Sequence, residues 1–572
     1  MAKQMTAVAQ PTSEPAPAGP ETGAAAIARV IADAGYDMIF GLPGGMTGLI
    51  SDEIYIQGRV PFVLVRHEQN ATIMADVYGR LTGRPGIALA QGVFMASNGG
   101  IGIMEARMSS SPMLVLTDST DGGSFAQYPI MQNGTGNFGA IDLPQIYGGM
   151  AKYFSFATTP KEAVQATQFG LRQAMLGRPG PSVVLSRAAA LKGIVDTESA
   201  PFMRPTAGYL DIPRSWPDPE TVTRAASAIA GARHPVIVAG NGVHMARAHD
   251  ELQLLAHRLG APVATSPKGR SALGDDDELS LGLMGGMGRA DTVRAFADAD
   301  AVIIVGSRLS VMTTDRHNKG LIDPDRQVLV QIDIEPDRTG WAFPVDHALV
   351  GDATVTLQQL LSGLEEELAG ERREPWFIRS PRPDAAPFDS DPVNPTPRRI
   401  IEVLNATLPA DTVVIVDAGK NKHYMVHDYR ARTAGGMIVP GGIAPMGWTA
   451  PATVAAKLLM PSRPCFGVAG DGGFAMTPHA IATAAQQGVA PIFLVMNDSA
   501  MMWHAAPDVD YPYAAEFSPV DFVSIARGYG GDGVRVEDAA GVAKAVGLAL
   551  QSKKPFVIDV VTDRETTAIP NE

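Results

Sequence analysis

Short, unbroken apolar runs alternate with helical stretches along almost the whole chain. Runs such as FVLV (62–65), VIVA (236–239) and CFGVAG (465–470) are typical of strands in parallel sheets, because crossover helices cover both faces of such sheets. Two stretches rich in proline and acidic residues, 196–220 and 370–397, interrupt the alternation and have the composition of linkers. The pattern therefore predicts an α/β protein with three domains, each built on a doubly wound parallel sheet.

The N-terminal region differs from the rest in composition. Residues 1–21 are rich in Ala, Pro, Ser and Glu and are predicted to form a disordered tail, because such residues cannot bury a core. Thr22 then precedes the helical pattern AAAIARVIADAG, which stops at Gly35, so we expect a helix capped by Thr22. With the linkers as boundaries, the three domains are expected at residues 22–190, 205–370 and 395–565.

Charge and cysteine content narrow the class of protein. The 572 residues include 46 Lys and Arg against 60 Asp and Glu, a net charge of −14, which argues against nucleic acid as a partner. The single cysteine, Cys465, excludes intrachain disulfides and sites with several cysteine ligands. The sequence contains no apolar run of about 18 residues and no signal-peptide pattern. We therefore expect a cytoplasmic enzyme without membrane partners.

Two polar residues follow neighbouring apolar strands in the C-terminal part of the chain. The strand CFGVAG runs into Asp471, and the strand PIFLVM (491–496) runs into Asn497. A right-handed crossover between them places both residues at one edge of a parallel sheet, where open α/β sheets bind ligands. Carboxylate and amide oxygens suit Mg²⁺ or Ca²⁺. A plain Asp-Gly-Gly turn between strand and helix is the alternative interpretation.

The glycines around Asp471 favour a phosphate nearby. Gly470, Gly472 and Gly473 allow backbone N–H groups to approach a phosphate closely. The helical stretch TPHAIATAAQQG (477–488) is expected to follow, with its N-terminus directed there.

These motifs resemble those of a known enzyme family. GDGG (470–473) followed by Asn497 resembles the thiamine-diphosphate signature, and further segments resemble the acetolactate synthase, pyruvate oxidase and benzoylformate decarboxylase-like branch of thiamine-diphosphate-dependent enzymes. The resemblance runs in order from about residue 22 to 562. The further segments are FGLPGG (40–45), RHEQNATIMADVYGRLTGRPG (66–86), GRPGP (177–181), HPVIVAGNG (234–242), QIDIEP (331–336), VGD (350–352) and GGIAPMGWTAPATVAAKL (441–458).

The resemblance implies thiamine diphosphate and Mg²⁺ as cofactors and assigns a role to each domain. The first domain would bind the aminopyrimidine, the central one would be Rossmann-like, and the third would bind the diphosphate. The implied metal ligands are Asp471, Asn497 and Ser499. The implied cofactor-binding residues are Gly44, Gly419, Lys420, Asn421, Ala444, Met446, Gly470, Gly472, Gly473 and Phe474.

Two of these residues have a plain structural alternative. Met446 resembles the residue that wedges under the cofactor in a Gly-x-Met-Gly turn, although a lone apolar residue belongs to a core far more often. Lys420 suits a phosphate as a point charge, and it is about as well explained as a solvated loop lysine.

Glu68 is the candidate catalytic residue. It ends the predicted strand FVLVRHE (62–68) and opens a helix, so we expect it at the carboxyl edge of a sheet. A glutamate at a helix N-terminus is also stabilised by about 0.3–1 kcal/mol without any catalytic role. The resemblance implies that Glu68 is the activating glutamate, which hydrogen-bonds N1′ of the aminopyrimidine.

The substrate side departs from the family pattern in three segments. Where the family has Gly-Pro-Gly-x-x-Asn, this chain has GVFMASN (92–98). Where Thr-Gly-Gln is common, it has Thr117-Asp118-Ser119. The segment after Asn497, DSAMMWHA (498–505), is shorter than in acetolactate synthases. Met501, Met502 and Trp503 are equally well explained as apolar packing. The candidate substrate-binding residues are His67, Gln69, Phe94, Met95, Met501, Met502 and Trp503.

The predicted reaction makes or breaks a C–C bond next to a carbonyl. The leading form is decarboxylation of a 2-keto acid followed by carboligation to an acceptor carbonyl, as in an acetolactate synthase. The alternatives are a lyase or hydrolase acting on a 2-hydroxyketone or diketone, and a non-catalytic regulatory relative. The presence of Glu68, Asp471 and Asn497 argues against the last of these.

The central domain carries weak nucleotide-binding signals. Gly240-Asn241-Gly242 follows a strand, but the last glycine of the dinucleotide fingerprint is missing, and a nicotinamide dehydrogenase would leave the other motifs unexplained. Arg308 stands where relatives that contain FAD carry an arginine, so FAD is allowed but not expected. The resemblance further implies a homodimer or homotetramer with active sites at the subunit interface.

Overall fold

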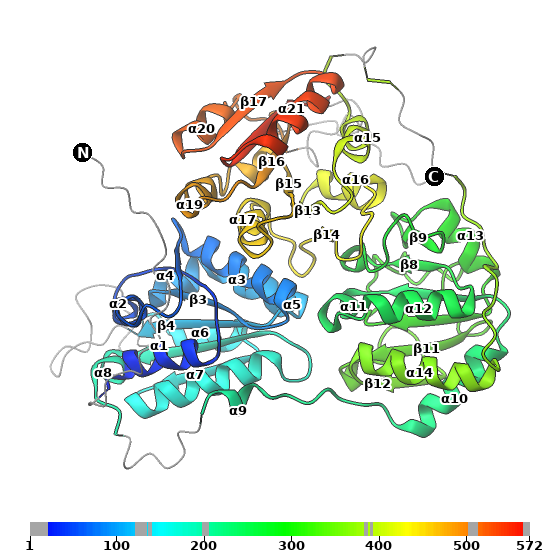
Figure 1. The fold of residues 1–572 in the computed structure, drawn as a ribbon, viewed down its shortest axis with the longest axis horizontal. Coiled ribbons are helices and arrows are strands. Elements are labelled where there is room, and N and C mark those ends of the chain that lie inside the picture. The colour runs from blue at the N-terminus through cyan, green and yellow to red at the C-terminus, as the bar shows by residue number, and fades with distance from the viewer. Residues whose placement is uncertain are drawn as a thin grey trace. The chain divides into compact units, whose positions relative to one another are not determined.

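Three parallel sheets form the framework of the protein (Figure 1). The structure is a computed structural model that describes residues 21–119, 134, 140–196, 205–381, 387–388, 393–501 and 513–563. The chain divides into two compact units, Met1–Pro213 and Arg214–Glu572. Each sheet has six strands, and all neighbouring strands pair in parallel. The predicted α/β fold with three doubly wound sheets is therefore confirmed.

The first unit contains one sheet with the strand order β2-β1-β3-β4-β6-β5. Figure 1 shows α3 and α5 on one side of this sheet and α1 and α7 on the other. In sheet order the strands are β2 (Phe62–Leu64), β1 (Ile39–Leu42), β3 (Gly86–Ala90), β4 (Met113–Ser119), β6 (Pro181–Arg187) and β5 (Tyr153–Ala157). The helices are α1 (Gly23–Asp33), α2 (Thr47–Gln57), α3 (Glu68–Thr82), α4 (Gly92–Ser97), α5 (Gly100–Ser109), α6 (Leu143–Met150), α7 (Pro160–Met175), α8 (Ala188–Lys192) and α9 (Ala207–Leu210).

Local sequence signals account for the ends of these helices. The Thr22 side chain accepts a hydrogen bond from Ala25 N at 3.1 Å, so Thr22 caps α1 as predicted. At α7, Thr159 and Glu162 form a capping box, and Pro160 occupies the first turn, where no N–H is needed. The helix α3 ends at Gly83, whose φ of 70° is a left-handed conformation that glycine adopts without strain.

The second unit begins with a sheet of order β12-β11-β10-β7-β8-β9. Separate apolar clusters cover its two faces, one formed with α10, α12 and α14 and the other with α13. In sheet order the strands are β12 (His347–Val350), β11 (Val328–Asp333), β10 (Ala301–Val305), β7 (Pro235–Ala239), β8 (Val263–Thr265) and β9 (Ser280–Leu283). The helices are α10 (Pro219–Gly231), α11 (Asn241–Ala246), α12 (His249–Leu259), α13 (Ala290–Asp298) and α14 (Ala353–Glu367), with 3₁₀ turns η1 (Pro267–Gly269) and η2 (Pro336–Arg338).

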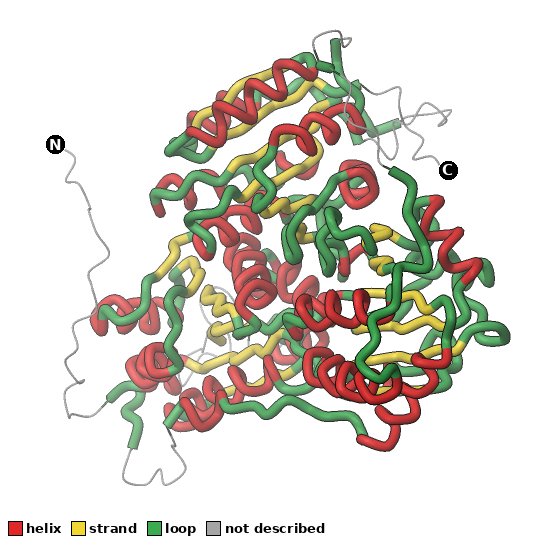
Figure 2. The backbone as a smooth tube through the Cα atoms, turned by 45° about the vertical axis from the view of Figure 1, so that its right-hand side comes forward, coloured by secondary structure: helices red, strands yellow, loops and turns green. Residues whose placement is uncertain are grey.

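The second unit continues with a sheet of order β14-β13-β15-β16-β18-β17. Residues from α15, α16 and α21 pack on one face of it, and Figure 2 shows its strands lying between helices. In sheet order the strands are β14 (Met437–Ile438), β13 (Val413–Val416), β15 (Cys465–Gly470), β16 (Ile492–Asn497), β18 (Phe556–Val561) and β17 (Asp532–Val536). The helices are α15 (Pro397–Thr407), α16 (Lys420–Asp428), α17 (Thr449–Leu459), α18 (Asp471–Phe474), α19 (Ala480–Gln487), α20 (Phe522–Gly528) and α21 (Ala539–Gln551).

One buried arginine joins the two sheets of the second unit. Arg270, 1% exposed, pairs with Asp275 at 2.8 Å. Its guanidinium also donates to the carbonyl oxygens of Val426 and Tyr429, each at 2.8 Å, at the C-terminal end of α16. Removing the guanidinium would leave the buried Asp275 carboxylate and the two carbonyl oxygens without their donors, which is costly. Arg270 therefore holds the loop after β8 against the end of α16.

Strand order places the loops that bind ligands in such folds. In the first sheet the order reverses between β1 and β3, in the second between β7 and β10, and in the third between β13 and β15. At such a switch point the loops after the two strands diverge and leave a crevice at the carboxyl edge. The segments 417–421 and 470–473 therefore follow the two strands at the switch point of the third sheet.

No helix among the described residues is long and apolar enough to cross a membrane.

Candidate functional site

Asp471 and Asn497 lie at the same edge of the third sheet. The strands β15 and β16 are neighbours in parallel register, with Gly470 opposite Met496. Asp471 directly follows β15, and Asn497 is the last residue of β16. The structure therefore confirms the predicted β-α-β unit and the position of both residues at its carboxyl edge.

Asp471 is a buried carboxylate with a raised affinity for protons. It is 5% exposed, and its two oxygens accept hydrogen bonds from Gly472 N at 2.6 Å and Ala500 N at 3.2 Å. Burial, together with the negative charge of Asp498, raises the pKa of Asp471 to about 6. A buried carboxylate beside a second acidic residue is an environment in which a bound cation relieves the electrostatic cost.

Asn497 is held so that its amide oxygen faces the loop after β16. Its Nδ2 donates to Asp559 Oδ1 at 2.8 Å, which leaves Oδ1 as the acceptor. That oxygen accepts from Ser499 N at 3.2 Å and from Ser499 Oγ at 3.4 Å. Ser499 has a φ of 54°, a left-handed conformation that is costly for a residue with a side chain. The three predicted metal ligands thus lie on one short, backbone-constrained edge.

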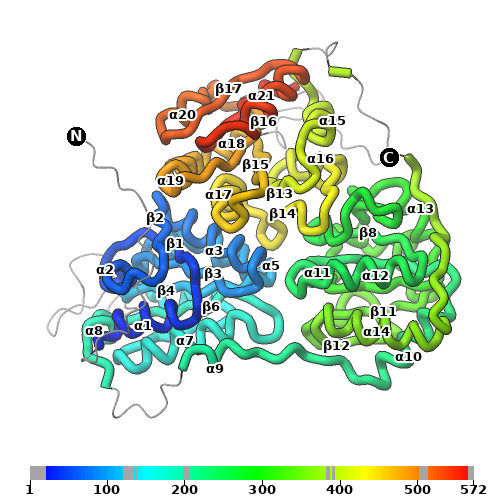
Figure 3. The backbone as a smooth tube through the Cα atoms, viewed as in Figure 1, coloured from blue at the N-terminus to red at the C-terminus, as the bar shows by residue number. Residues whose placement is uncertain are grey.

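The helix expected after the glycine turn is present, and a single helical turn precedes it. The sequence predicts a helical stretch over residues 477–488, and the structure has α19 over Ala480–Gln487. The single-turn α18 (Asp471–Phe474), which begins at the glycine turn itself, was not predicted. Figure 3 shows α18 beside β15 and β16. Between the two helices, the buried Thr477 hydroxyl donates to Gly447 O at 2.7 Å. Pro478 follows it and disfavours helical backbone at Thr477. The helical N-terminus at the glycine turn is therefore that of α18, not that of α19.

The segment 417–421 lies close to this glycine turn. Asn421 Nδ2 donates to Asp417 O at 3.3 Å and to Val468 O at 3.4 Å, so Asn421 bridges β13 and β15. A Cβ atom at Gly470 would lie 3.8 Å from Asn421 Oδ1. Gly419, with a φ of 110°, needs the freedom of glycine at the start of α16. The structure therefore brings Gly419, Asn421 and Gly470 together, as a diphosphate site requires.

Lys420 is buried at the first position of α16. It is only 6% exposed, so the alternative of a solvated loop lysine does not describe it. Burial, with smaller contributions from the charges of Lys422 and Lys420, lowers the pKa of the neighbouring His423 to about 4. A buried cation at this position favours an anionic group nearby.

Asp417 joins three of the predicted cofactor-binding segments. Its carboxylate is fully buried and accepts hydrogen bonds from Gly447 N at 2.9 Å and Trp448 N at 3.0 Å. A Cβ atom at Gly473 would lie 2.3 Å from Asp417 Oδ2, so only glycine fits there. Burial raises the pKa of Asp417 to about 6. The Asp417 carboxylate thus holds the turn before α17 and the glycine turn close to the segment 417–421.

The turn before α17 contains Ala444 and Met446. Ala444 has a φ of 51° and Gly447 a φ of 75°, so the backbone is left-handed at both positions. Met446 is half-buried in this turn, which differs from the fully buried side chain that a core residue would have. The strained alanine is typical of backbone that is held in place for a ligand.

Phe474 has a different environment from the other predicted cofactor residues. Its side chain is 1% exposed and packs against Phe493 and Phe522, with ring centroids 5.7 and 5.6 Å apart. The ring belongs to an aromatic core, so any contact of Phe474 with a cofactor would come from its backbone.

In the first unit, Glu68 lies where the sequence places it. It is the first residue of α3 and is 7% exposed. The strand expected to reach Glu68 ends earlier, at Leu64, so residues 65–67 form a short connection between β2 and α3. Asn98 Nδ2 donates to Glu68 Oε2 at 2.9 Å. The glutamate thus has a specific hydrogen-bond partner in addition to its place in the first turn of α3.

Gly44 lies in the loop after β1 at the switch point of the first sheet. A Cβ atom at Gly44 would lie 3.2 Å from Gln91 Oε1, and one at Gly45 would lie 2.5 Å from Asp118 Oδ2. Asp118 also accepts hydrogen bonds from Met46 N at 2.7 Å and Gly92 N at 2.8 Å. The acidic residue that replaces the usual glycine thus ties together the loops after β1 and β3.

The predicted substrate residues of the first unit have mixed environments. His67 caps α3, because its Nδ1 accepts from Gln69 N at 3.3 Å. Gln69 is half-buried and Phe94 is exposed. Met95 is fully buried, and its sulfur lies 2.6 Å from where a Cβ atom at Gly99 would be. Met95 is thus positioned for packing, while Gln69 and Phe94 remain accessible.

Met501 lies near the glycine turn of the third sheet. Its sulfur would be 3.1 Å from a Cβ atom at Gly472, and its N–H donates to Ala515 O at 2.6 Å. The other two candidates of this segment, Met502 and Trp503, lie outside the described residues.

The glycine pattern of the central sheet is explained by close loop packing. Gly242 N donates to Gly306 O at 2.9 Å, and a Cβ atom at Gly242 would lie 2.5 Å from the Gly306 Cα atom. Gly240 is similarly close to Gly306 O, at 2.3 Å from its own Cβ position. Arg308 is exposed. These glycines are required by contact between the loops after β7 and β10, whether or not a nucleotide binds.

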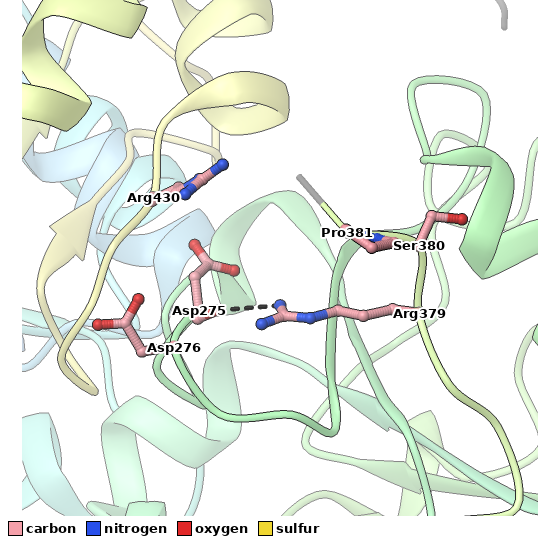
Figure 4. A pocket seen from close by; sticks show the side chains of 6 residues that line it. All are labelled: Asp275, Asp276, Arg379, Ser380, Pro381 and Arg430. Carbon is pink, nitrogen blue, oxygen red and sulfur yellow. Dashed lines mark hydrogen bonds between the residues drawn. The ribbon is translucent and has the colours of Figure 1, made fainter. Parts of the chain in front are cut away.

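A pocket of about 170 Å³ lies elsewhere in the second unit (Figure 4). The Arg379 side chain reaches toward Asp275 and donates to Asp275 O and Ser280 O, each at 2.9 Å. None of the predicted site residues lines this pocket. Its lining residues are Asp275, Asp276, Arg379, Ser380, Pro381 and Arg430.

Sequence reasoning missed the partners that orient the candidate residues. They are Asn98, Asp118, Asp417, Asp498 and Asp559. Asp417 and Asp559 could have been identified from the sequence. Each lies in or directly after an apolar strand, and an acidic residue in such a place needs a buried partner.

Three family descriptions match successive parts of the chain. "Thiamine pyrophosphate enzyme, N-terminal TPP binding domain" matches residues 21–135. "Thiamine pyrophosphate enzyme, central domain" matches residues 222–360. "Thiamine pyrophosphate enzyme, C-terminal TPP binding domain" matches residues 417–560.

Similar proteins cover nearly the whole chain. The probable acetolactate synthase large subunit of Methanocaldococcus jannaschii is 29% identical over 561 residues, which cover 95% of this chain and 92% of that protein. The acetolactate synthase large subunit of Parasynechococcus marenigrum is 29% identical, over 96% of this chain and 89% of that protein. The acetolactate synthase large subunit of Corynebacterium glutamicum is also 29% identical, over 97% and 89%.

Proposed function

Because the chain belongs to the thiamine pyrophosphate enzymes, we propose that it decarboxylates a small 2-keto acid and ligates the product to an acceptor carbonyl. It is a thiamine-diphosphate-dependent enzyme of the carboligase and decarboxylase type, similar to acetolactate synthase large subunits along about 95% of its length. The observation that supports the proposal most is the convergence of the segments 417–421, 444–448 and 470–473 on the buried Asp417 carboxylate.

Thiamine diphosphate with Mg²⁺ is the cofactor, and the edge of the third sheet fits this pair. We assign the cation to the Asp471 carboxylate, the Asn497 amide oxygen and Ser499, which are hard oxygen donors. The diphosphate would lie against Gly419, Lys420, Asn421 and the turn 470–473, where glycines leave the backbone open and Lys420 supplies a buried positive charge. We likewise assign the pyrimidine-binding, central and diphosphate-binding roles to residues 22–190, 205–370 and 395–565.

Glu68 would exchange a proton with the ring nitrogen N1′ of the aminopyrimidine. When bound, the cofactor supplies a carbanion at C2 that attacks carbonyl carbon atoms. Glu68 suits the proton exchange because it is buried, lies at the start of α3 and is oriented by Asn98. The turn at Ala444 and Met446 would hold the pyrimidine ring, with Ala444 O and Met446 N–H addressing its edge.

The active enzyme would be a homodimer or homotetramer in the cytoplasm, with each active site shared between subunits. The first and third sheets carry complementary halves of the predicted cofactor set: Glu68 and Gly44 on one, and the diphosphate and metal residues on the other. The substrate is a small carbonyl compound, and its identity would be set by candidates such as Gln69, Phe94 and Met501.

Calorimetric titration of the metal-stripped protein with thiamine diphosphate, with and without Mg²⁺, tests the cofactor site. We expect binding that depends on Mg²⁺ in the wild type and is weakened at least tenfold in Asp471→Ala, because the carboxylate supplies the charged ligand. Asp411→Ala is the matched control, since Asp411 is an exposed acid of the same domain and its backbone carbonyl oxygen accepts a hydrogen bond from Arg463 that the substitution keeps. Binding to Asp471→Ala as tight as to the wild type would remove the metal assignment.

Product analysis then tests the reaction itself. The loaded enzyme is incubated with pyruvate alone and with pyruvate plus a series of aldehyde and keto-acid acceptors, and the products are identified by mass. We expect a ligated hydroxyketone or hydroxyacid product whose formation requires the acceptor. Cleavage of a 2-hydroxyketone or a diketone without any ligation would instead favour a lyase or a hydrolase.

A further inference from the structure

The helix α4 of the first unit is held at its first residue by Asp118. Gly92 N donates to Asp118 Oδ1 at 2.8 Å, and the Tyr147 hydroxyl donates to Gly92 O at 2.7 Å. A Cβ atom at Gly92 would lie 1.9 Å from Asp118 O, so the helix begins in tight contact with the end of β4. Both α4 and Asp118 belong to segments where this chain departs from the pattern of its family.

The other end of α4 reaches Glu68 through Asn98. Asn98 follows the last residue of the helix, and its N–H donates to Phe94 O at 2.8 Å. Its side-chain Nδ2 donates to Glu68 Oε2 at 2.9 Å. Glu68 is 7% exposed, so water competes little for this hydrogen bond, and a hydrogen bond to a carboxylate in such surroundings is strong.

We propose that Asn98 is a positioning residue that selects which oxygen of Glu68 handles the proton. The inference deepens the proposed function and rests on it. An amide N–H₂ can only donate to Oε2, so Oε2 serves as an acceptor and the proton that Glu68 gives or takes resides on Oε1. The carboxyl group is thereby fixed in rotation, with one oxygen presented to the cofactor side. In this role Asn98 acts through Glu68.

A purely structural role for the Asn98 side chain is not needed to explain α4. Asparagine is favoured at helix C-termini for its left-handed conformation, but Asn98 has φ −69° and ψ −42°, which any residue adopts. The chain continues through Gly99 into α5 with backbone hydrogen bonds of its own. The side-chain amide is thus left to Glu68, and its chemistry can be tested without disturbing the helix cap.

The test is the rate at which the C2 proton of bound thiamine diphosphate exchanges with deuterium in the holoenzyme without substrate, measured by rapid quench and proton NMR. We compare the wild type with Asn98→Ala, Asn98→Asp and Ser97→Ala. Asn98→Asp keeps the shape of the side chain but replaces the donor by an acceptor. Ser97→Ala alters the neighbouring exposed residue, whose hydroxyl bonds only to carbonyl oxygens of its own helix.

We expect exchange to slow about tenfold to hundredfold in Asn98→Ala and at least as much in Asn98→Asp. Thiamine diphosphate affinity, measured by calorimetry, should change less than about threefold, and Ser97→Ala should match the wild type. Wild-type exchange in Asn98→Asp would overturn the inference, because shape alone would then suffice. Loss of cofactor binding in both Asn98 variants would overturn it too, by showing a structural role.

The outcomes also separate this inference from the proposed function. A wild type that neither binds thiamine diphosphate nor exchanges its C2 proton overturns the proposed function, and the positioning role falls with it. A wild type that binds and exchanges, with both Asn98 variants equally fast, overturns only the positioning role.

Discussion

Glu68 is a buried carboxylate at the start of a helix, and it can act through its negative charge or by exchanging a proton. A substitution that removes only the proton exchange distinguishes the two roles. Glu68→Gln keeps the size of the side chain and an oxygen that can accept from Asn98, but it cannot carry an acidic proton. We expect kcat to fall about 10²- to 10⁴-fold, the usual contribution of a general acid or base. Steady-state kinetics with the best 2-keto acid measures this loss.

Cofactor affinity provides the control for Glu68→Gln. Calorimetry should show thiamine diphosphate bound within a few fold of the wild-type affinity, since the diphosphate and metal residues are untouched. Glu53→Gln on α2 should behave as the wild type in both assays. Undiminished turnover in Glu68→Gln would mean that another group handles the proton.

His423 predicts a pH dependence of stability. Burial, with Lys422 and Lys420 nearby, lowers the pKa of His423 from 6.5 to about 4 in the folded protein. Between these values the unfolded chain binds more protons, so the free energy of unfolding decreases as the pH falls through this window. The decrease attributable to His423 between pH 7 and pH 5 is about 2 kcal/mol.

Urea unfolding of the wild type and of His423→Gln at pH 7 and pH 5 measures this term. The variant cannot titrate, so its stability should change less with pH, by about the same 2 kcal/mol. His317→Gln replaces an exposed histidine and should retain the full wild-type dependence. Equal pH dependence in His423→Gln and the wild type would contradict the buried neutral state of His423.

At this scale the sequence could locate chemistry-bearing residues but not their partners. Glu68, Asp471 and Asn497 each follow an apolar strand, and strand ends can be read from apolar runs. Asn98 lies 30 positions from Glu68, and Asp559 lies 62 positions from Asn497. Contacts across such distances depend on how helices pack on the sheet, which local patterns do not encode.

At the scale of elements, three loops are connected by one carboxylate. Asp417 accepts from Gly447 N and Trp448 N with both oxygens. In the variant Asp417→Asn, one of these N–H groups would face an amide N–H₂, and an unsatisfied buried donor costs about 1–3 kcal/mol. We expect thiamine diphosphate affinity to fall about fivefold to hundredfold, because the turn 444–448 loosens. Calorimetric titration in the presence of Mg²⁺ measures the change.

A matched substitution separates this effect from general destabilisation. Asp521 caps α20 with a carboxylate that accepts from Ser524 N at 2.8 Å, on the exposed surface of the same unit. Asp521→Asn should leave cofactor affinity unchanged. Equal affinity in Asp417→Asn and Asp521→Asn would show that the buried carboxylate has no special part in assembling the site.

Element boundaries were predicted well where caps and apolar runs decide them and poorly where tertiary contacts do. Thr22 caps α1 as its sequence indicates. The helix expected over residues 477–488 is present as α19, whereas the single turn α18 at Asp471 was not predicted. The helix α4 had no signal of its own, since its first residue is held by Asp118 from β4 and not by a local cap.

At the scale of the whole molecule, the fold class followed from the sequence because repeated strand and helix patterns are local. Three six-stranded parallel sheets correspond to the three runs of alternation. The two compact units were harder to predict. The second sheet joins the third through the buried Arg270, whose partners in the third sheet's domain, the carbonyl oxygens of Val426 and Tyr429, lie more than 150 positions along the chain. An arginine in a polar segment offers no indication that it will be fully enclosed.

Subunit sharing of the active site can be tested by complementation. Glu68→Gln lacks the proton-handling residue of the first unit, and Asp471→Ala lacks a metal ligand of the second, so each homo-oligomer should be nearly inactive. In a shared site, a mixed dimer contains one site with both wild-type residues and one site with neither. Random pairing of equal amounts makes about half of the dimers mixed, so about a quarter of wild-type activity should return.

Co-expression of the two variants with different affinity tags, followed by sequential purification of the doubly tagged oligomer, provides the mixed species directly. Its activity should be about half that of the wild type per site, and thiamine diphosphate should bind tightly to one site in two. A site built within a single chain would give a different result, because every subunit of the mixed oligomer then retains one of the two defects. Activity as low as that of the separate variants would therefore place Glu68 and Asp471 of the same chain in one site.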